Sequence, residues 1–339
     1  MPSDFQKYSQ FYKPPETEQK PGQIVDITGW SLGGDFDPYA EGTRSKFAVR
    51  CPSGEVYPFL IPEHRYLYKK AFERKKSGYI FHEQFWIEII AYKIGRYLGI
   101  EVPPAFVACR TVPGAEQKEY ACLIEWFHGY PQAPQARVDR GGDFMSLQIP
   151  DYDRDKGSQH NFETIIELFK DMGISDWQIK WARMLLLDCL IGNTDRHQEN
   201  WEVISYFDQT GRYNIDLSPA FDNGTAMGYE VLAQKMPSKL QNLGAYIDKG
   251  THHMRWGIND PRHVGHFELL QKLASTYPQT QPEMARILSQ DPSPLCEDIK
   301  RLTEFDIQNP EYCLTPRRAD FMTRLLTARH QRAQEAIGA

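Results

Sequence analysis

Residues 188–200 read DCLIGNTDRHQEN, and this stretch decides which fold the sequence predicts. An apolar helical run, MLLLDCLIG, ends inside it and gives way to a block of Asn, Asp, Arg, His and Asn. Asp195 and Asn200 lie five residues apart in this block, in a predicted loop between a helix and a strand. Asp and Asn are also common turn residues, so the meaning of the loop depends on residues elsewhere in the chain.

A second acidic residue follows in the segment SPAFDNGTAMG, residues 218–228. Asp222 comes directly after an apolar pair and directly before the turn pair Asn223 and Gly224. Two carboxylates and one amide are therefore expected at the ends of short strands, on the C-terminal side of an apolar helix. Oxygen ligands of this kind suit Mg²⁺ or Mn²⁺ better than zinc.

The N-terminal part supplies a cation and a carboxylate that need each other. Lys69 ends the strand-like segment RYLYK, and Glu88 lies in the helical pattern FWIEIIAYKIGRYLGI with apolar neighbours on both sides. A carboxylate in apolar surroundings is costly to bury without a cation partner. Lys69 is the natural partner, although Lys46 and Lys70 compete for the same role.

These parts together match the phosphoryl-transfer machinery of protein kinases: a strand lysine, a helix glutamate, a D-x-x-x-x-N loop and a later Asp on a turn. In that chemistry Asp195 positions the acceptor hydroxyl and takes up its proton. Asn200 and Asp222 hold metal ions on the phosphates, and Lys69, held by Glu88, grips the phosphates. A glycine-containing loop in the segment EGTRSKFAV, residues 41–49, is the candidate for phosphate contacts through backbone amides, with GGDF at 33–36 as the second choice.

The order of predicted elements indicates an α+β protein with two lobes. Short strands are expected in QIVDITGW, SKFAVRC, EVYPFLI and RYLYK, followed by a long helix over 78–99 and two strands within 100–110 and 119–127. Helices are then expected over 161–172, 175–191, 263–276, 281–289, 296–307 and 316–336, with a hairpin from WEVISYF to YNIDL. The S-x-x-Q pattern at Ser175 is typical of a capping box. We divide the chain into an arm (1–22), a small β-rich N-lobe with one long helix (23–128) and a mainly helical C-lobe (129–339), in which 129–160 is a linker or inserted loop.

Composition narrows the classes of protein that remain. The chain has 339 residues, 41% of them hydrophobic, and a formal net charge of -6, which argues against direct nucleic-acid binding. No apolar run is long enough to span a membrane, and the N-terminus lacks a signal-peptide pattern, so we expect a cytoplasmic protein. The six cysteines are scattered without a C-x-x-C pair, and the histidines at 252, 253, 263 and 266 have no partners at ligand spacing, which disfavours a zinc site.

The stretches IGNTDRHQENW and SPAFDNG resemble the HipA-like serine/threonine kinases of bacteria. The catalytic loop of that family reads N-x-D-x-H-x-x-N, which corresponds here to Asn193, Asp195, His197 and Asn200. RYLYK with the following helix is similar to the family's lysine strand and glutamate helix, and GTRSK is similar to its short phosphate-binding loop. The resemblance covers about residues 40–230, in a short form that lacks the extra N-terminal subdomain of full-length HipA.

The resemblance implies a two-lobed, protein-kinase-like fold and transfer of phosphate from ATP, with Mg²⁺ (or Mn²⁺), to a hydroxyl of a protein. The family includes toxins that phosphorylate components of translation and are controlled by an antitoxin, and it also includes secreted effectors. A regulatory partner and a protein substrate are therefore expected. Some members are silenced by autophosphorylation in the phosphate loop, for which Thr43 and Ser45 are the candidate acceptors here.

Further residues receive supporting roles or stay ambiguous. The implied nucleotide site is the following set: Gly42, Thr43, Arg44, Ser45, Lys46, Lys69, Glu125 and Phe127. Asn193, His197 and Asp188 are expected to support the catalytic loop, whereas Arg196 either contacts phosphate or braces that loop. Glu125 and Phe127 either border the adenine or pack in the core. Two other classes of function remain open: a lipid or small-molecule kinase, and a pseudokinase that binds nucleotide or a partner without transfer. Nucleotidyl transfer on the same fold is a further alternative.

Overall fold

A computed structural model describes residues 17–32, 45–54, 57–74, 79–131, 136–208 and 210–338. Within these residues, six strands form the main sheet in the order β1-β7-β8-β4-β3-β2. They are β1 (Val25–Asp26), β2 (Ser31–Leu32), β3 (Lys46–Arg50), β4 (Arg65–Lys69), β7 (Ala105–Arg110) and β8 (Glu119–Glu125). β1 pairs with β7 in parallel, and the other neighbours are antiparallel.

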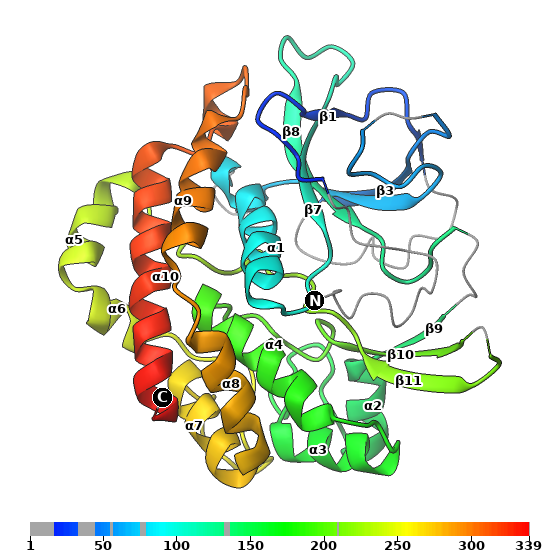
Figure 1. Ribbon diagram of the computed structural model, residues 1–339, viewed down its shortest axis with the longest axis vertical. Coiled ribbons are helices and arrows are strands. Elements are labelled where there is room, and N and C mark those ends of the chain that lie inside the picture. Colours follow the sequence, from blue (N-terminus) through cyan, green and yellow to red (C-terminus); the bar gives the residue numbers. More distant parts are fainter. Residues whose placement is uncertain are drawn as a thin grey trace.

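Helix α1 (Trp86–Leu98) packs on β7 and β8 and lies between the sheet and the helical part of the molecule (Figure 1). Its apolar residues recur at helical spacing, and Gly99 ends it with a left-handed φ of 72° that glycine adopts without steric cost. The buried residues of α1 belong to the same hydrophobic cluster as those of the C-terminal helices. The position of α1 is therefore set by both parts of the molecule.

The C-terminal part is mainly helical. Its helices are α2 (Gly141–Gln148), α3 (Phe162–Asp171), α4 (Trp177–Ile191), α5 (Met236–Gln241), α6 (Leu243–Asp248), α7 (His266–Thr276), α8 (Gln281–Leu288), α9 (Ser293–Arg301) and α10 (Pro316–Ile337). Short 3₁₀ turns lie at Ala233–Lys235, Pro278–Thr280, Leu302–Glu304 (η5) and Pro310–Tyr312 (η6). Helix α4 contacts α7, α8 and α10 and is apolar on several faces, as expected for a helix in the centre of a core. None of the helices in the described ranges has both the length and the apolar character needed to cross a bilayer.

Two small sheets complete the fold. β9 (Arg137–Arg140), β10 (Glu202–Phe207) and β11 (Tyr213–Leu217) form an antiparallel sheet in which β10 is central. β5 (Phe72–Arg74) and β6 (Tyr79–Phe81) form a hairpin that leads into the 3₁₀ turn η2 (His82–Phe85) before α1. The predicted hairpin from WEVISYF to YNIDL is thus confirmed as β10 and β11.

Several predicted elements are wrong. The described part of EVYPFLI, residues 57–61, forms turns instead of a strand, because Pro58 and Pro62 cannot donate to a sheet ladder; Phe59 is nevertheless buried in the outer core of the sheet. The long helix begins at Trp86 and not at 78, since the aromatic residues before it pair as β6. The capping box at Ser175 is absent: Asp176, with a φ of 54°, is the N-cap of α4.

The segment predicted as a linker, 129–160, contains β9 and α2. β9 pairs with β10 through Arg140 opposite Glu202, so this segment is part of the helical lobe and borders the catalytic loop. Helices α5 and α6 were not predicted, because each has six residues and neither shows a sustained apolar period. The division of the chain into arm, N-lobe and C-lobe at 22 and 128 remains a prediction.

Candidate active site

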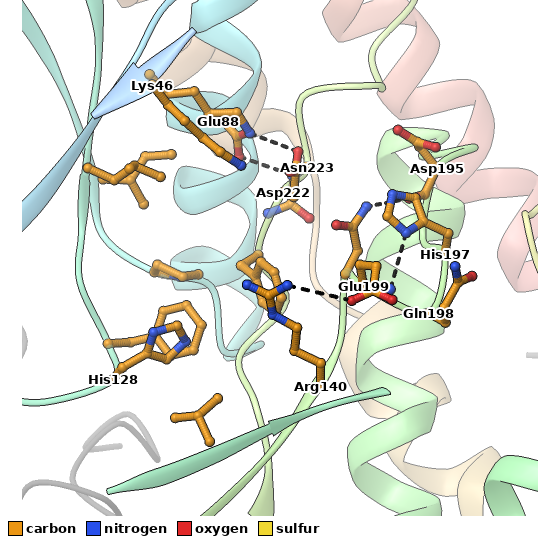
Figure 2. Close-up of a pocket in the computed structure, with 18 of the residues that line it drawn as sticks. Lys46, Glu88, His128, Arg140, Asp195, His197, Gln198, Glu199, Asp222 and Asn223 are labelled. Atoms are coloured by element: carbon orange, nitrogen blue, oxygen red, sulfur yellow. Dashed lines mark hydrogen bonds and ion pairs between the residues drawn. The ribbon is translucent and has the colours of Figure 1, made fainter. Parts of the chain in front are cut away.

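A cleft of about 1060 Å³ is lined by residues of both the main sheet with α1 and the helical part. Most of the residues singled out from the sequence face this one cleft. They are Lys46, Lys69, Glu88, Glu125, Phe127, Asp195, His197, Asn200 and Asp222. Figure 2 shows Glu88, Asp222 and Asn223 on one side of the cleft, with Asp195 and His197 across from them.

Lys69 joins α1 to the turn that carries Asp222 through two ion pairs. Its Nζ lies 2.6 Å from Glu88 Oε1 and 2.7 Å from Asp222 Oδ1. The side chains of Lys69 and Glu88 are each only 5% exposed, whereas that of Asp222 is 28% exposed. Of the two competing lysines, Lys70 forms an ion pair with Glu119, and Lys46 lines the cleft at the start of β3.

The loop that carries Asp195 is held by its own neighbours. Helix α4 ends at Gly192, whose φ of 69° lets the chain turn out of the helix. Asn193 Oδ1 accepts a hydrogen bond from the Asp195 amide at 3.0 Å, and Asn200 Nδ2 donates to the Asp195 carbonyl at 2.6 Å. Thr225 Oγ1 donates to Asp195 Oδ2 at 3.3 Å. These bonds fix the direction in which the Asp195 carboxylate points.

Arg196 lies fully buried beneath the loop and braces it. Its Nε and Nη2 donate to the two carboxylate oxygens of Asp188 at 3.0 and 2.7 Å, and Nη1 donates to the carbonyls of Asn200 and Phe221. Burial alone would raise the pKa of Asp188, but the charge of Arg196 and a hydrogen bond from His252 outweigh it and hold that pKa well below its usual range. Of the two roles considered for Arg196, the structure shows the bracing one.

The turn that carries Asp222 is tied to both α1 and the catalytic loop. Asp222 has a φ of 52°, uncommon for a residue other than glycine. The Asn223 amide donates to Glu88 Oε2 at 3.1 Å, and Asn223 Oδ1 accepts from Arg196 Nη2 at 2.7 Å. One carboxylate, Glu88, thus binds the lysine through one oxygen and the Asp222 turn through the other.

Gln84, in η2, also holds this turn, and the sequence analysis missed it. Its side chain is 1% exposed; Nε2 donates to the Gly224 carbonyl at 2.7 Å and Oε1 accepts from the Phe72 amide at 2.9 Å. A glutamine at the start of an apolar helix carries no local signal for this role, because both of its partners are brought to it by the tertiary fold.

The other end of the cleft is apolar. Leu67, Ala105, Ile124 and Phe127 line it, together with Val102 and Phe221. The rings of Phe127 and Phe221 lie 5.4 Å apart, which closes this end. Glu125 is 1% exposed and accepts a hydrogen bond from the Tyr130 hydroxyl at 2.7 Å. An apolar slot with few polar groups is typical of a site for a flat ring.

A group of charged residues that the sequence analysis missed forms the rim on the side of the helical part. Arg154 makes two hydrogen bonds to Glu199, at 2.7 and 2.9 Å, and Arg140 lies 3.9 Å from the same carboxylate. Gln198 Nε2 donates to the Arg154 carbonyl at 2.6 Å. Figure 2 shows Arg140 and Glu199 facing each other beside the catalytic loop. The charged RVDRGG pattern was assigned to a linker, and only its pairing with β10 brings it to the cleft.

Part of the predicted phosphate loop lies outside the described residues. This applies to Gly42, Thr43 and Arg44, and to GGDF at 33–36. Ser45 is exposed, and its carbonyl accepts a hydrogen bond from the Lys70 amide at 3.0 Å, next to the start of β3. Ser45 therefore lies beside the strand that faces β4 and Lys69.

The donors in the cleft fit a magnesium ion that is bound together with phosphates. Asn200 uses Nδ2 to bind its own loop, which leaves an amide oxygen as its acceptor atom, and Asp222 offers carboxylate oxygens. Among the described residues, no group of three or more His, Cys, Asp or Glu side chains is arranged to hold a metal ion. Mg²⁺ commonly binds through one or two protein oxygens plus water and substrate phosphates, so two ligands suit a metal that arrives with a nucleotide.

The histidines near the loop make hydrogen bonds and ring contacts with their neighbours. His252 Nε2 lies 3.2 Å from Asp188 Oδ2, and His197 Nδ1 accepts a hydrogen bond from the Glu199 amide at 3.1 Å. His253 packs its ring 5.7 Å from that of His197. His197 thus supports the backbone of the catalytic loop.

Comparison with solved structures identifies the fold, and comparison with family models then identifies the family. A crystal structure of the Helicobacter pylori proinflammatory kinase CtkA is similar to this chain with a TM-score of 0.66 and 16% identity, over 93% of this chain and 98% of that one. HipA of Shewanella oneidensis MR-1, solved with HipB and operator DNA, matches with a TM-score of 0.43 and 14% identity over 90% of this chain and 66% of that one. No curated protein matches by sequence. The fold is thus the predicted α+β, two-lobed kinase-like fold.

The family follows from the sequence itself. Residues 40–290 match the family described as the HipA-like C-terminal domain. The chain belongs to this HipA-like family, as the resemblance of IGNTDRHQENW and SPAFDNG predicted.

Proposed function

We propose that this protein is an ATP- and Mg²⁺-dependent protein serine/threonine kinase. The observation that carries the proposal is the position of Lys69 Nζ, 2.6 Å from Glu88 and 2.7 Å from Asp222, in a cleft that Asp195 and Asn200 also line. The ammonium group of Lys69 can bind nucleotide phosphates. The Asp195 carboxylate, which lines the same cleft, can accept the proton of a substrate hydroxyl. The membership of the chain in the HipA-like family supports the same reading.

Each residue has a defined task in this reaction. Lys69 binds nucleotide phosphates, and Glu88 keeps its ammonium group in place. Asp195 orients the acceptor hydroxyl and takes up its proton, while Asn193 and Thr225 hold Asp195. Asn200 and Asp222 would hold Mg²⁺, which neutralises charge on the transferred phosphoryl group when it is bound. The apolar end of the cleft, with Phe127 and the neighbouring Glu125, would receive the adenine.

The first test is intact-mass spectrometry of the purified protein after incubation with Mg²⁺ and ATP, beside Asp222→Ala. Wild type is expected to gain the mass of one or more phosphoryl groups, and the variant is expected to gain none. A gain of AMP would make the protein a nucleotidyl transferase. An unchanged mass in wild type, with no phosphate on an added protein mixture, would contradict the proposal and favour a nucleotide-binding pseudokinase.

Autophosphorylation is proposed for Thr43 or Ser45. Ser45 is exposed and adjoins β3, which borders the cleft. A kinase that modifies its own phosphate loop would block nucleotide contacts through the added charge. Peptide mapping of residues 41–49 after incubation with ATP tests this assignment, and phosphate found only on other peptides would overturn it.

The family also suggests a role in the cell. We propose that the protein acts in the bacterial cytoplasm on a protein substrate, with a component of translation as the candidate, and that an antitoxin-like protein restrains it. Expression of wild type should then slow growth, and expression of Asp222→Ala at the same level should not. Equal growth of the two strains would contradict the toxin role and leave the proposed transfer reaction standing.

A further inference from the structure

Residues 17–23, here called the N-terminal strap, cross the outer side of α1 and β7. Gln19 makes the closest contact with the sheet: its Oε1 accepts from the Val107 amide and its Nε2 donates to the Val107 carbonyl, both at 2.8 Å. The same Nε2 also donates to the Gln23 carbonyl at 2.9 Å. One side-chain amide therefore satisfies both backbone groups of a residue in β7, as a neighbouring strand would.

This contact extends the sheet by one residue. β1 pairs in parallel with β7 through Val25 opposite Ala108 and Asp26 opposite Cys109. Val107 is the preceding residue of β7, so Gln19 continues the pairing on the N-terminal side of β1. The strap is held at this point by directed hydrogen bonds and not by general apolar packing.

The strap also contacts the C-terminal half of α1. Glu18 lies 3.3 Å from Lys93 Nζ and 3.2 Å from an Arg96 nitrogen. At its other end, the carbonyl of Pro21 accepts a hydrogen bond from the Asp306 amide at 3.4 Å. The strap thus connects α1, the edge of the sheet and the segment after η5.

A cavity lies where these elements meet. It measures about 300 Å³ and is lined by Glu18 and Gln19 of the strap, by Ile89 and Tyr92 of α1, and by Phe305 near η5. Side chains that border a cavity lose van der Waals contacts on that side. The hydrogen bonds and ion pairs of the strap connect the elements that surround this cavity.

Ile89, which borders the cavity, directly follows Glu88. A small shift of α1 toward or away from the cavity therefore moves Glu88 relative to Lys69 and relative to the Asn223 amide. We propose that the strap is a positioning element of the active site, in which Gln19 and Glu18 hold α1 so that Glu88 stays paired with Lys69. The part of this inference that concerns catalysis rests on the kinase function proposed above.

The test compares steady-state kinetics of the full-length Gln19→Ala and Lys20→Ala proteins. Gln19→Ala removes the side-chain bonds to Val107, and we expect the KM for ATP to rise about five- to tenfold, on the scale of one or two lost hydrogen bonds, with a smaller change in kcat. Lys20→Ala alters an exposed side chain of the same segment and keeps the backbone bond of Lys20 to Gln23. It is expected to match wild type.

A charge-reversal pair separates positioning from a general loss of structure. E18R places a third cation beside Lys93 and Arg96 and should raise the KM for ATP, while E18R/R96E restores one opposite-charge contact and should lower it again. Both proteins are measured at a temperature where circular dichroism shows them folded. Equal KM values for wild type, Gln19→Ala and E18R would overturn the proposal.

A measurement without nucleotide keeps this inference distinct from the kinase proposal. Hydrogen exchange of the amides in Trp86–Leu98 should be faster in Gln19→Ala than in wild type or Lys20→Ala, because the strap no longer limits local opening of α1. If wild type transfers no phosphate, the kinase proposal fails. The hydrogen-exchange result alone then tests whether the strap holds α1 in place. Unchanged exchange in Gln19→Ala would refute the strap's role whatever the activity.

Discussion

Lys69 is the residue that connects α1 with the turn that carries Asp222. It sits between a buried carboxylate, Glu88, and a partly exposed one, Asp222. Lys69 thus bonds to two carboxylates at once, and a divalent cation brought in with a nucleotide would add positive charge beside the more exposed of the two. The Glu88 carboxylate also accepts a hydrogen bond from the Asn223 amide, so loss of Glu88 would remove one partner from the lysine and one from the Asp222 turn.

The Lys69–Glu88 pair lends itself to a double-mutant cycle. Glu88→Leu removes the buried carboxylate beside Lys69, and Lys69→Met removes the cation beside Glu88, so each is expected to lower the free energy of unfolding by about 3–5 kcal/mol. The double variant replaces the pair with apolar side chains and should lose clearly less than the sum of the two. Urea unfolding followed by tryptophan fluorescence measures all four proteins; additive losses would show that the pair is not coupled.

Arg196 is a second residue whose chemistry can be tested by a conservative change. Arg196→Lys keeps the charge but loses the planar fork that reaches Asp188 through two nitrogens and Asn223 through a third contact. We expect the variant to fold with an unfolding free energy lower by about 1–3 kcal/mol and with a large loss of activity, measured by urea unfolding and phosphate incorporation. Arg332→Lys, in an exposed pair with Asp248, is the control and should stay close to wild type.

The sequence was most informative where polar residues interrupt apolar runs. Glu88 stands out because its neighbours are isoleucine and tryptophan, which predicted that it needs a cation partner. Lys69, at the end of the strand-like RYLYK, was the candidate, and Lys46 and Lys70 competed with it. The contacts of Gln84 and Arg140 could not be predicted from their neighbours in the sequence. Their partners, Gly224 and Glu199, are far away in the chain, and no periodicity or spacing connects them. Assigned roles in catalysis remain predictions for all of these residues.

At the scale of elements, the first residue of α2 lies in close contact with the loop that carries Asp195. A Cβ added to Gly141 would lie 2.2 Å from the ring of Trp201 and 2.6 Å from the backbone carbonyl of Gln198. Neither a buried indole nor a catalytic-loop carbonyl can move away cheaply. Glycine at this position lets α2 approach the loop that carries Asp195.

Gly141→Ala is therefore expected to destabilise the protein by about 1–3 kcal/mol through overpacking and to reduce phosphate transfer by displacing the catalytic loop. Thermal unfolding and a phosphorylation assay measure the two effects. Gly244→Ala is the matched control, since a Cβ at Gly244 in α6 would meet nothing within 4 Å and alanine favours a helix. A Gly141→Ala protein as stable as Gly244→Ala would show that the contact is not tight in solution.

The missed elements share a physical cause. β9 reads RVDR and forms only because it pairs with β10, which lies more than sixty residues later by the register of Arg140 with Glu202. Phe59 in EVYPFLI is buried, as expected for a residue of a strand. The segment nevertheless forms turns, because apolar residues in a turn flanked by prolines give the same sequence pattern as a short strand. Helices α4 and α10 were predicted because their length gives the helical period enough residues to be recognised.

At the scale of the whole molecule, one hydrophobic cluster runs from α1 through α4 to α10. The cleft is therefore bordered on one side by an element whose core is shared with the helical lobe. The strap contacts α1 next to the cavity that Ile89, Tyr92 and Phe305 line. In the inference above, the position of Glu88 depends on this core and on the polar contacts of the strap.

The histidine cluster behind the catalytic loop makes the stability of the whole fold depend on pH. His160 is fully buried and accepts a hydrogen bond from the Trp201 indole N–H on Nε2 at 3.0 Å, which requires that nitrogen to be unprotonated. Burial, reinforced by the nearby His253, lowers the pKa of His160 well below its usual value, and burial with the neighbouring His197 and His263 lowers the pKa of His253 to about 4. Both rings are therefore neutral in the native protein at pH values where free histidines are charged.

Because these folded-state pKa values lie below the unfolded value of about 6.5, the unfolded chain binds more protons as the pH falls. The stability that the neutral rings contribute is thus complete above about pH 6.5 and is lost progressively as the pH falls toward 4. We expect the urea midpoint to decrease steadily between pH 7 and pH 5, a window in which ordinary carboxylates remain charged. His253→Gln should make this decrease less steep. A urea midpoint that is independent of pH in wild type would contradict the prediction, because it would mean that the histidines have the same pKa values in the folded and the unfolded chain.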